Sequence, residues 1–315
     1  MVEVESRIEK RAAGATKLTE AEAKGRILEY ALWLKKNGYR DSTVRIRSKR
    51  LMVLHKRGAN IFDPESVKEV IAQQEWNEGT KAQAVVDYTS FIEMLGMKWN
   101  PPRYKQTQKI PFVPLEKEID QLIAGLGKKA ATFTQTIKET GARPGEVARL
   151  EWVDIDAERN IIRINKPEKN SNPRIRKVSS KFMAMLNSLP RNEPRVFDTL
   201  LKHMRKNFYN QRVSIAKKLQ NPRIQQVNWC SIRHWVGTME YHKTKDIMHV
   251  REVLGHKSIQ NTMIYINLEQ TTFQEQNDEF TTRVATSLKG ARALLEAGFD
   301  YVMEMDGIKV FRKRK

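Results

Sequence analysis

Three residues far apart in the second half of the chain could together transfer a phosphoryl group. Arg143 lies in the segment TGARPGE, Arg233 lies in the segment SIRH, and Tyr265 follows the segment LGHKSI. Two guanidinium groups can hold both non-bridging oxygens of a phosphodiester while negative charge builds around phosphorus. A tyrosine hydroxyl is a poor nucleophile at neutral pH, so it needs positive charges nearby and in-line placement. These residue types make Tyr265 a candidate nucleophile toward a phosphodiester held by the two arginines.

The composition of the chain favours the same kind of substrate. The 315 residues include 57 Lys and Arg against 37 Asp and Glu, a formal charge of +20 that predicts a polyanionic partner such as nucleic acid. With 40% hydrophobic and 8% aromatic residues the chain is not a disordered basic tail, and its length predicts about two domains. Cys230 is the single cysteine, which excludes an intramolecular disulfide and cysteine-based zinc clusters.

Nothing in the sequence predicts a membrane protein. No apolar run approaches the ~18 residues that a membrane span requires. The start MVEVESRIEK does not resemble a signal peptide. We therefore expect a soluble intracellular protein with no membrane partner.

The first half of the chain has the apolar periodicity of a small all-α domain over 18–98, preceded by a flexible N-terminus over 1–17. Thr19 and Glu22 form a capping box at the start of the first helix, and the pair Asn37-Gly38 ends it. An Asp-Pro pair, typical of an N-cap followed by the first helical residue, starts the third. We predict four helices, over 19–36, 42–55, 64–74 and 84–95.

Two basic segments of this half could contact DNA. The stretch 42–60 holds six basic residues and no acidic one. Such a run can be a merely solvated helix face, but in a chain of charge +20 it favours contact with phosphates. Four prolines and an excess of basic residues make 99–114 a basic interdomain linker rather than a helix or a central strand. The candidate DNA contacts are Arg45, Arg47, Lys49, Arg50, Lys105 and Lys109.

The elements that must position Arg143, Arg233 and Tyr265 are mainly helical. We predict helices over 115–125 and 129–140, a helix restarting at Pro144, and helices through 180–288. We predict short strands near 151–155, 161–166 and 174–179, a hairpin around the polar loop 166–173, and a second hairpin at Asp306-Gly307. The predicted fold is therefore mainly α with a small β-sheet.

The segments that contain Arg143, Arg233 and Tyr265 resemble, in order and spacing, the motifs of the tyrosine recombinase (phage integrase) family. TGARPGE is similar to the first arginine box, SIRH to the second, and LGHKSI leading to TMIY to the box that ends in the nucleophile. Arg233 precedes His256 by 23 residues, and His256 precedes Tyr265 by nine. The resemblance covers most of 115–266. The ending FRKRK and the segment GFDYV look like those of archaeal virus and plasmid integrases.

The resemblance implies a domain organisation and a reaction. It implies a helical core-binding domain over 18–98, an α+β catalytic domain over 115–270, and a tail over 271–315 that contacts a neighbouring protomer. Members of the family exchange strands between double-stranded DNA attachment sites through a Holliday junction, as a homotetramer. They conserve bond energy in a 3′-phosphotyrosine link, so neither ATP nor a metal is expected. A cytoplasmic location at the host nucleoid follows.

The resemblance also implies roles for further residues. A lysine on a hairpin between the two arginine boxes protonates the departing 5′ oxygen, and Lys166 fits best, with Lys169 as the alternative. His256 hydrogen-bonds the phosphate, and Glu146 orients active-site groups. His234, directly after Arg233, matches a position that we interpret as structural.

Cys230 stands where the family usually has a histidine, three residues before the second arginine. Either its thiolate assists deprotonation of Tyr265, or it is a small buried filler. We favour the filler because a thiolate would oppose the negative charge of the phosphate. Two other functions use similar features: a type IB topoisomerase, which relaxes DNA without a fixed site, and a non-catalytic DNA-binding regulator. The joint presence of Arg143, Arg233, His256 and Tyr265 argues against the regulator.

Overall fold

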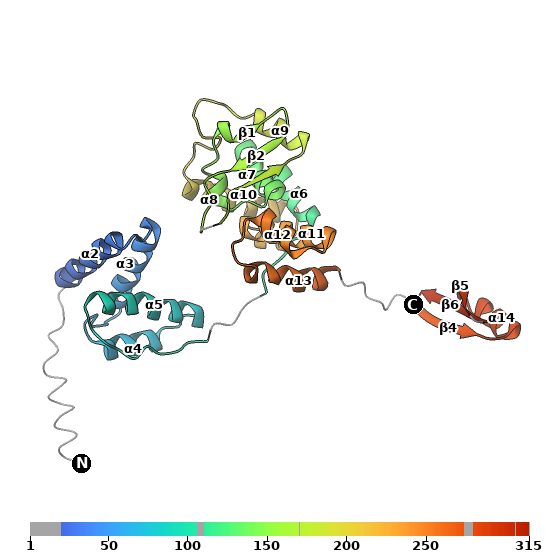
Figure 1. Cartoon of the computed structure of the whole chain (residues 1–315), viewed down its shortest axis with the longest axis horizontal. Coiled ribbons are helices and arrows are strands. Elements are labelled where there is room, and N and C mark those ends of the chain that lie inside the picture. Colours follow the sequence, from blue (N-terminus) through green and yellow to red (C-terminus); the bar gives the residue numbers. More distant parts are fainter. Residues whose placement is uncertain (1–19, 106–109, 170, 274–279, 306, 315) are drawn as a thin grey trace, which may run out of the picture. The chain divides into compact units, whose positions relative to one another are not determined.

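The computed structural model describes residues 20–105, 110–169, 171–273, 280–305 and 307–314 (Figure 1). Close backbone contacts divide the chain into two compact units, residues 1–109 and 110–315. The boundary between them falls within the proline-rich stretch 99–114. Among the described residues, no helix is both long and apolar enough to cross a membrane.

The described residues of the N-terminal unit contain the four predicted helices, although the fourth begins at Glu78 instead of near residue 84. Asp63 accepts a hydrogen bond from the Glu65 backbone N–H at 3.0 Å, which caps the third helix as expected. Tyr88 and Phe91 are buried at the centre of the unit, and the Tyr88 hydroxyl donates to the Ile61 carbonyl at 3.0 Å. The predicted cap Thr19 lies outside the described residues. The helices are α2 (Glu20–Lys36), α3 (Asp41–Lys56), α4 (Pro64–Gln73) and α5 (Glu78–Met94).

The core of the second unit is built around Trp229. Its indole N–H donates to Thr134 Oγ1 at 3.1 Å, and its ring packs against Phe133 and Phe208 at centroid distances of 4.5 and 4.8 Å. These contacts fix the helix that carries Arg233 against the helix that ends before Arg143. The helices of this part are α6 (Glu116–Gly125), α7 (Lys128–Thr140), α8 (Pro144–Val147), α9 (Ser180–Asn187), α10 (Leu201–Lys218), α11 (Trp229–Thr244), α12 (Ile247–Leu254) and α13 (Gln260–Phe273), with the 3-10 helix η2 (Pro222–Gln226) before α11.

A three-stranded antiparallel sheet lies between α8 and α9 in the chain. Its order is β1 (Ile155–Asp156), β2 (Ile161–Ile164), β3 (Arg174–Lys177). Ile164 pairs with Arg174, so the predicted hairpin around 166–173 is confirmed. The strand predicted near 151–155 is wrong for most of its length, because the Asp154 carboxylate accepts from the Glu151 N–H at 3.1 Å and closes the 3-10 helix η1 (Trp152–Asp154).

The last part of the chain is a second small sheet with one helix. Its elements are β4 (Phe280–Ala285), α14 (Leu288–Glu296), β5 (Asp300–Met305) and β6 (Ile308–Arg314), in sheet order β4-β6-β5. The hairpin predicted at the C-terminal end is confirmed by the antiparallel pairing of β5 with β6, and Gly307 has a φ of +75°. The helical pattern predicted up to 288 is wrong at β4, where β-branched residues pair with β6.

Candidate active site

Arg143 is placed by a sharp change of direction after α7. Gly141 ends that helix with a φ of +62°, and a Cβ atom there would lie 3.0 Å from Leu254 Cδ2. Both facts favour glycine at this position. Pro144 then opens α8, and the Arg143 backbone N–H donates to the Glu146 carboxylate at 2.8 Å. The TGARPGE segment thus turns the Arg143 side chain toward Ser171, whose hydroxyl accepts a hydrogen bond from its guanidinium.

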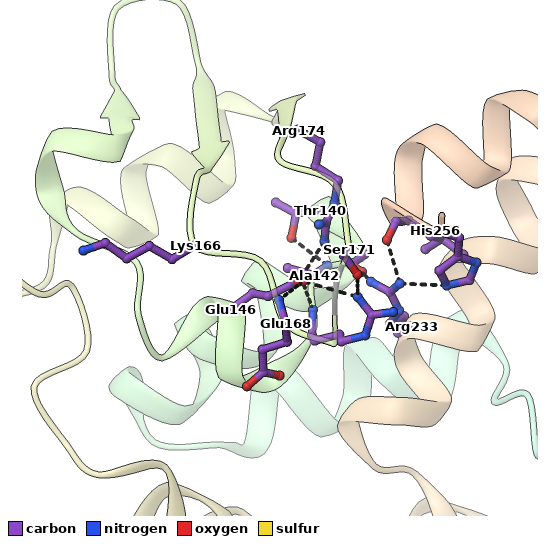
Figure 2. A network of polar contacts seen from close by, with 12 residues as sticks. Thr140, Ala142, Glu146, Lys166, Glu168, Ser171, Arg174, Arg233 and His256 are labelled. Carbon is purple, nitrogen blue, oxygen red and sulfur yellow. Dashed lines mark hydrogen bonds and ion pairs between the residues drawn. The ribbon is translucent and has the colours of Figure 1, made fainter. Parts of the chain in front are cut away.

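The Glu146 carboxylate is the buried centre of this network (Figure 2). It accepts hydrogen bonds from the Arg174 guanidinium at 2.6 Å and from the Glu168 backbone N–H at 3.1 Å, besides its bonds to Arg143. Burial opposes its ionisation, but the hydrogen bond and charge of Arg174 outweigh burial and lower the pKa of Glu146 to about 2. An ionised Glu146 therefore holds hydrogen bonds to both Arg143 and Arg174.

Arg233 connects all three sequence motifs. It is buried on α11, and its guanidinium donates to the Gly141 carbonyl and, at 2.7 Å, to the Leu254 carbonyl. The same group lies 3.0 Å from His256 Nε2. Burial and then the charge of Arg143 lower the pKa of Arg233 to about 9, so it remains a cation at neutral pH.

The tautomer of His256 follows from its neighbours. A guanidinium can only donate, so Nε2 of His256 accepts from Arg233, and Nδ1 carries the proton that it donates to Thr262 Oγ1 at 3.0 Å. Burial, then Arg233, lowers the pKa of His256 to about 3, which keeps the ring neutral. In this arrangement His256 holds Arg233 in place and also ties the start of α13 to the site.

Tyr265 is buried on α13, with 2% of its surface exposed. Its hydroxyl lies 3.3 Å from His234 Nδ1. Burial raises the pKa of Tyr265, while the charges of Arg233 and Arg143 act in the opposite direction. The nucleophile candidate and both arginines therefore influence one another, although they come from α13, α11 and the residue just before α8.

The structure does not bring the lysine candidates to the arginines. The Lys166 side chain is 51% exposed, forms an ion pair with Glu151 and points away from Arg233 and His256 (Figure 2). Lys169 is exposed at the turn of the hairpin loop, with a φ of +51°. Ser171 is the side chain of this loop that contacts Arg143.

Arg174 is a site residue that sequence reasoning missed. Its side chain is 5% exposed and pairs with Glu146, while its Nε and Nη1 atoms have no hydrogen-bond partner among the described residues. Gly255 makes room for it, since a Cβ there would lie 2.9 Å from Arg174 Nη1. Buried, unsatisfied donors of a guanidinium suit an anionic oxygen. Side chains alternate between the two faces of a strand, so Arg174 and Arg176 share one face of β3. This alternation is the sequence signal that could have identified Arg174.

Cys230 is exposed, so the expectation of a buried filler was wrong. The reason is local. Asn228 caps α11 and accepts from the Cys230 N–H at 2.9 Å, and Trp229, Ser231 and Ile232 around Cys230 take the buried positions of this first turn. The thiol is thus directed to the surface at the start of the helix.

The basic face of α3 is divided between two roles. Arg45 and Lys49 are exposed, whereas the side chains of Arg47 and Arg50 are only 16% and 22% exposed and both pair with the buried Asp87 on α5. The second pair of arginines therefore joins α3 to α5. Lys105 is exposed, and Lys109 lies outside the described residues.

Together, the α+β fold and a site of arginines, a neutral histidine and a tyrosine match the arrangement that the sequence motifs predicted. Residues 115–272 match the model of the phage integrase family, and the chain belongs to this family.

The chain is also similar to a named relative, and its fold is similar to that of solved structures. The chain is 24% identical over 194 residues to the tyrosine recombinase XerA of Saccharolobus solfataricus, an alignment that covers 58% of this chain and 62% of XerA, just under two thirds of that relative. Its fold is similar to that of the Tn1549 transposon integrase in complex with transposon right-end DNA (TM-score 0.55, 13% identity, 79% of this chain and 99% of that chain). It is also similar to the XerH recombinase bound to its difH substrate (TM-score 0.55, 16% identity, 74% and 80%).

Proposed function

We propose that this chain is a site-specific DNA recombinase that cleaves and rejoins strands through a 3′-phosphotyrosine intermediate and a Holliday junction, without ATP or a metal. The observation that carries the proposal is Arg233, whose hydrogen bonds to Gly141, Leu254 and His256 join the three motifs around one cationic site.

The proposed reaction follows from these groups. Tyr265 Oη attacks the phosphorus atom, the bond to the 5′ oxygen breaks, and a 3′-phosphotyrosine forms. Arg143 and Arg233 stabilise the charge on the non-bridging oxygens. The free donors of Arg174 support a third contact to the same phosphate. Attack by the 5′ hydroxyl of another strand reverses the step and completes strand exchange.

We assign protonation of the 5′ oxygen to Lys166, with Lys169 as the alternative. For Lys166 to act, bound DNA must separate it from Glu151, with which it now pairs. The exposure of the Lys166 side chain supports this assignment, because little packing opposes such a movement.

The remaining assignments concern DNA and assembly. Residues 18–98 would bind one face of double-stranded attachment-site DNA through Arg45 and Lys49, followed by the basic linker 99–114 and the catalytic domain 115–270, in the cytoplasm at the host nucleoid. A homotetramer would perform the exchange, with the tail 271–315 against a neighbouring protomer. Val284 and Met303 both pair with Val310, so they share one sheet face, and their exposure (63% and 48%) supports a protein contact there.

Trapping the covalent intermediate tests the proposal. The protein is incubated with random-sequence nicked duplexes in excess EDTA and without ATP, and the DNA of any covalent product is sequenced. We expect an adduct with a defined sequence preference, and none with Tyr265→Phe. An adduct without sequence preference would support a type IB topoisomerase instead, and no adduct at all would support a DNA-binding regulator.

A further inference from the structure

The hydroxyl of Tyr265 has a specific partner that the sequence motifs do not assign. His234 Nδ1 lies 3.3 Å from Tyr265 Oη, and the two ring centroids are 6.0 Å apart. We propose that His234 is the catalytic base for the nucleophile: its Nδ1 takes the phenolic proton of Tyr265 during DNA cleavage. This inference rests on the proposed recombinase function.

The packing of the Tyr265 ring against α11 keeps its hydroxyl next to His234. Gly237 follows His234 by three residues on α11, and a Cβ at Gly237 would lie 2.6 Å from both Cε1 and Cζ of Tyr265. Because residues three apart share a helix face, the ring rests on the helix backbone with its hydroxyl beside His234.

The protonation states of the two groups are those that the assignment requires. Burial and then the charge of Arg233 lower the pKa of His234, so the ring is neutral at pH 7 and Nδ1 can accept a proton. Burial raises the pKa of Tyr265, so this phenol gains from a base. The charged or titratable groups that act on this pair are Arg233 and Cys230 on α11, Arg143 before α8, and His256 after α12.

The other candidates for a base are placed differently. Nε2 of His256 already accepts from Arg233, and its Nδ1 donates to Thr262. Cys230, in the position of the usual histidine, is exposed at the start of α11. His234 is the histidine that contacts the reacting oxygen.

The step balances as a proton transfer coupled to substitution at phosphorus. The O–H bond of Tyr265 breaks, its proton forms a bond to His234 Nδ1, and Oη forms the new bond to phosphorus. The bond from phosphorus to the 5′ oxygen breaks, and that oxygen takes a proton from the acid assigned to Lys166. In the reverse direction, His234 returns its proton to Tyr265.

The test separates the attacking side from the leaving side of the reaction. Single-turnover cleavage is measured for His234→Gln on ordinary DNA and on DNA whose bridging 5′ oxygen is replaced by sulfur, a leaving group that needs no protonation. We expect a loss of at least ~10²-fold on both substrates, the scale of general base catalysis. Lys166→Ala, by contrast, should cleave the sulfur substrate at close to the rate of the unsubstituted protein. The inference would be overturned if His234→Gln cleaved ordinary DNA within tenfold of the rate of the unsubstituted protein, or faster. It would also be overturned if the sulfur substrate restored the cleavage rate of His234→Gln.

Two further measurements keep the outcome clear. His249→Gln is a matched control, because this half-buried histidine of α12 pairs with Glu240, and the variant should cleave normally. In the unsubstituted protein, cleavage should slow as pH falls through the pKa of His234, where the base becomes protonated, and a flat profile there would contradict the inference without depending on any variant. If the unsubstituted protein forms no adduct, the proposed function fails; if it forms one and His234→Gln does too at full rate, only the base assignment fails.

Discussion

Arg174 and Glu146 form a buried ion pair, with Nη2 donating to Oε2 at 2.6 Å, and it fixes the first arginine box against the hairpin 28 residues away. Glu146 also accepts from the Arg143 N–H, so one carboxylate orients two guanidinium groups. The sequence motif TGARPGE contains Glu146 but not Arg174. The other comes from β3, and the pairing of the hairpin brings it to the site.

This ion pair predicts an acid-sensitive stability. The folded pKa of Glu146 is about 2, below its ordinary 4.5, so the pair stabilises the fold above pH 4.5 and the stabilisation is lost as pH falls toward 2. The difference corresponds to about 3 kcal/mol. In urea unfolding at pH 7 and pH 3, Glu146→Gln should be less stable at pH 7 and show a weaker pH dependence. Glu116→Gln removes an exposed carboxylate that pairs with the largely buried Lys138, and it should change little because Asp120 still pairs with Lys138. An equal loss in both variants would refute the assignment.

Catalysis should require the hydrogen-bonding geometry of the Arg233 guanidinium as well as its charge. Arg233→Lys keeps a cation but cannot donate to Gly141 and Leu254 while also contacting His256. We expect cleavage to fall by ~10²–10³, the effect of removing one preorganised donor to a developing anion. Single-turnover assays at saturating DNA measure it. Arg159→Lys, at an exposed arginine paired with Asp156, should retain full activity; a loss under tenfold for Arg233→Lys would place the phosphate site elsewhere.

Gly237 should be needed for the position of Tyr265. In Gly237→Ala the new methyl group overlaps the tyrosine ring, so the ring or α13 must shift. We expect a loss of about 1–3 kcal/mol in stability and a fall in cleavage larger than any fall in DNA affinity. Gly25→Ala is the matched control, because that helical glycine of α2 has open space around it and should gain ~0.5–1 kcal/mol. Normal cleavage by Gly237→Ala would show that the ring is not seated there in the active complex.

DNA binding should depend steeply on salt. A protein that neutralises roughly 6–10 phosphates loses ~10³–10⁵ in affinity between 50 and 200 mM salt. Arg45→Ala should reduce the salt slope by about 0.9 for one lost phosphate contact, whereas Arg50→Ala should mainly destabilise the N-terminal unit, because Arg50 pairs with Asp87. Fluorescence anisotropy over a salt series and thermal unfolding distinguish the two effects. A flat salt response would contradict the DNA-binding assignment.

Cys230 should be accessible and dispensable. Because its side chain is exposed, a maleimide should modify the native protein at this residue. Cys230→Ala should lower cleavage less than tenfold, which is about 1.4 kcal/mol of barrier. A loss beyond a hundredfold would make the thiol a participant in the reaction.

The sequence by itself determined the local elements and the identity of most site residues. Caps such as Asp63, the apolar periodicity of the helices and the polar loop before Arg174 depend on neighbours within a few positions, so their patterns are readable along the chain. The order and spacing of the motifs singled out Arg143, Arg233, His256 and Tyr265, and the structure places Arg233 in hydrogen-bond contact with two of the three segments.

Only the tertiary structure decided which of these groups meet. The pairing of Arg50 with Asp87, of Arg174 with Glu146 and of His234 with Tyr265 joins residues 37, 28 and 31 positions apart. The exposure of Cys230 and the direction of Lys166 were likewise invisible in the motifs. Their common cause is that a side chain takes its partner from whichever element packs against its own, and the packing of elements depends on the complementarity of whole faces rather than on residues adjacent in the sequence.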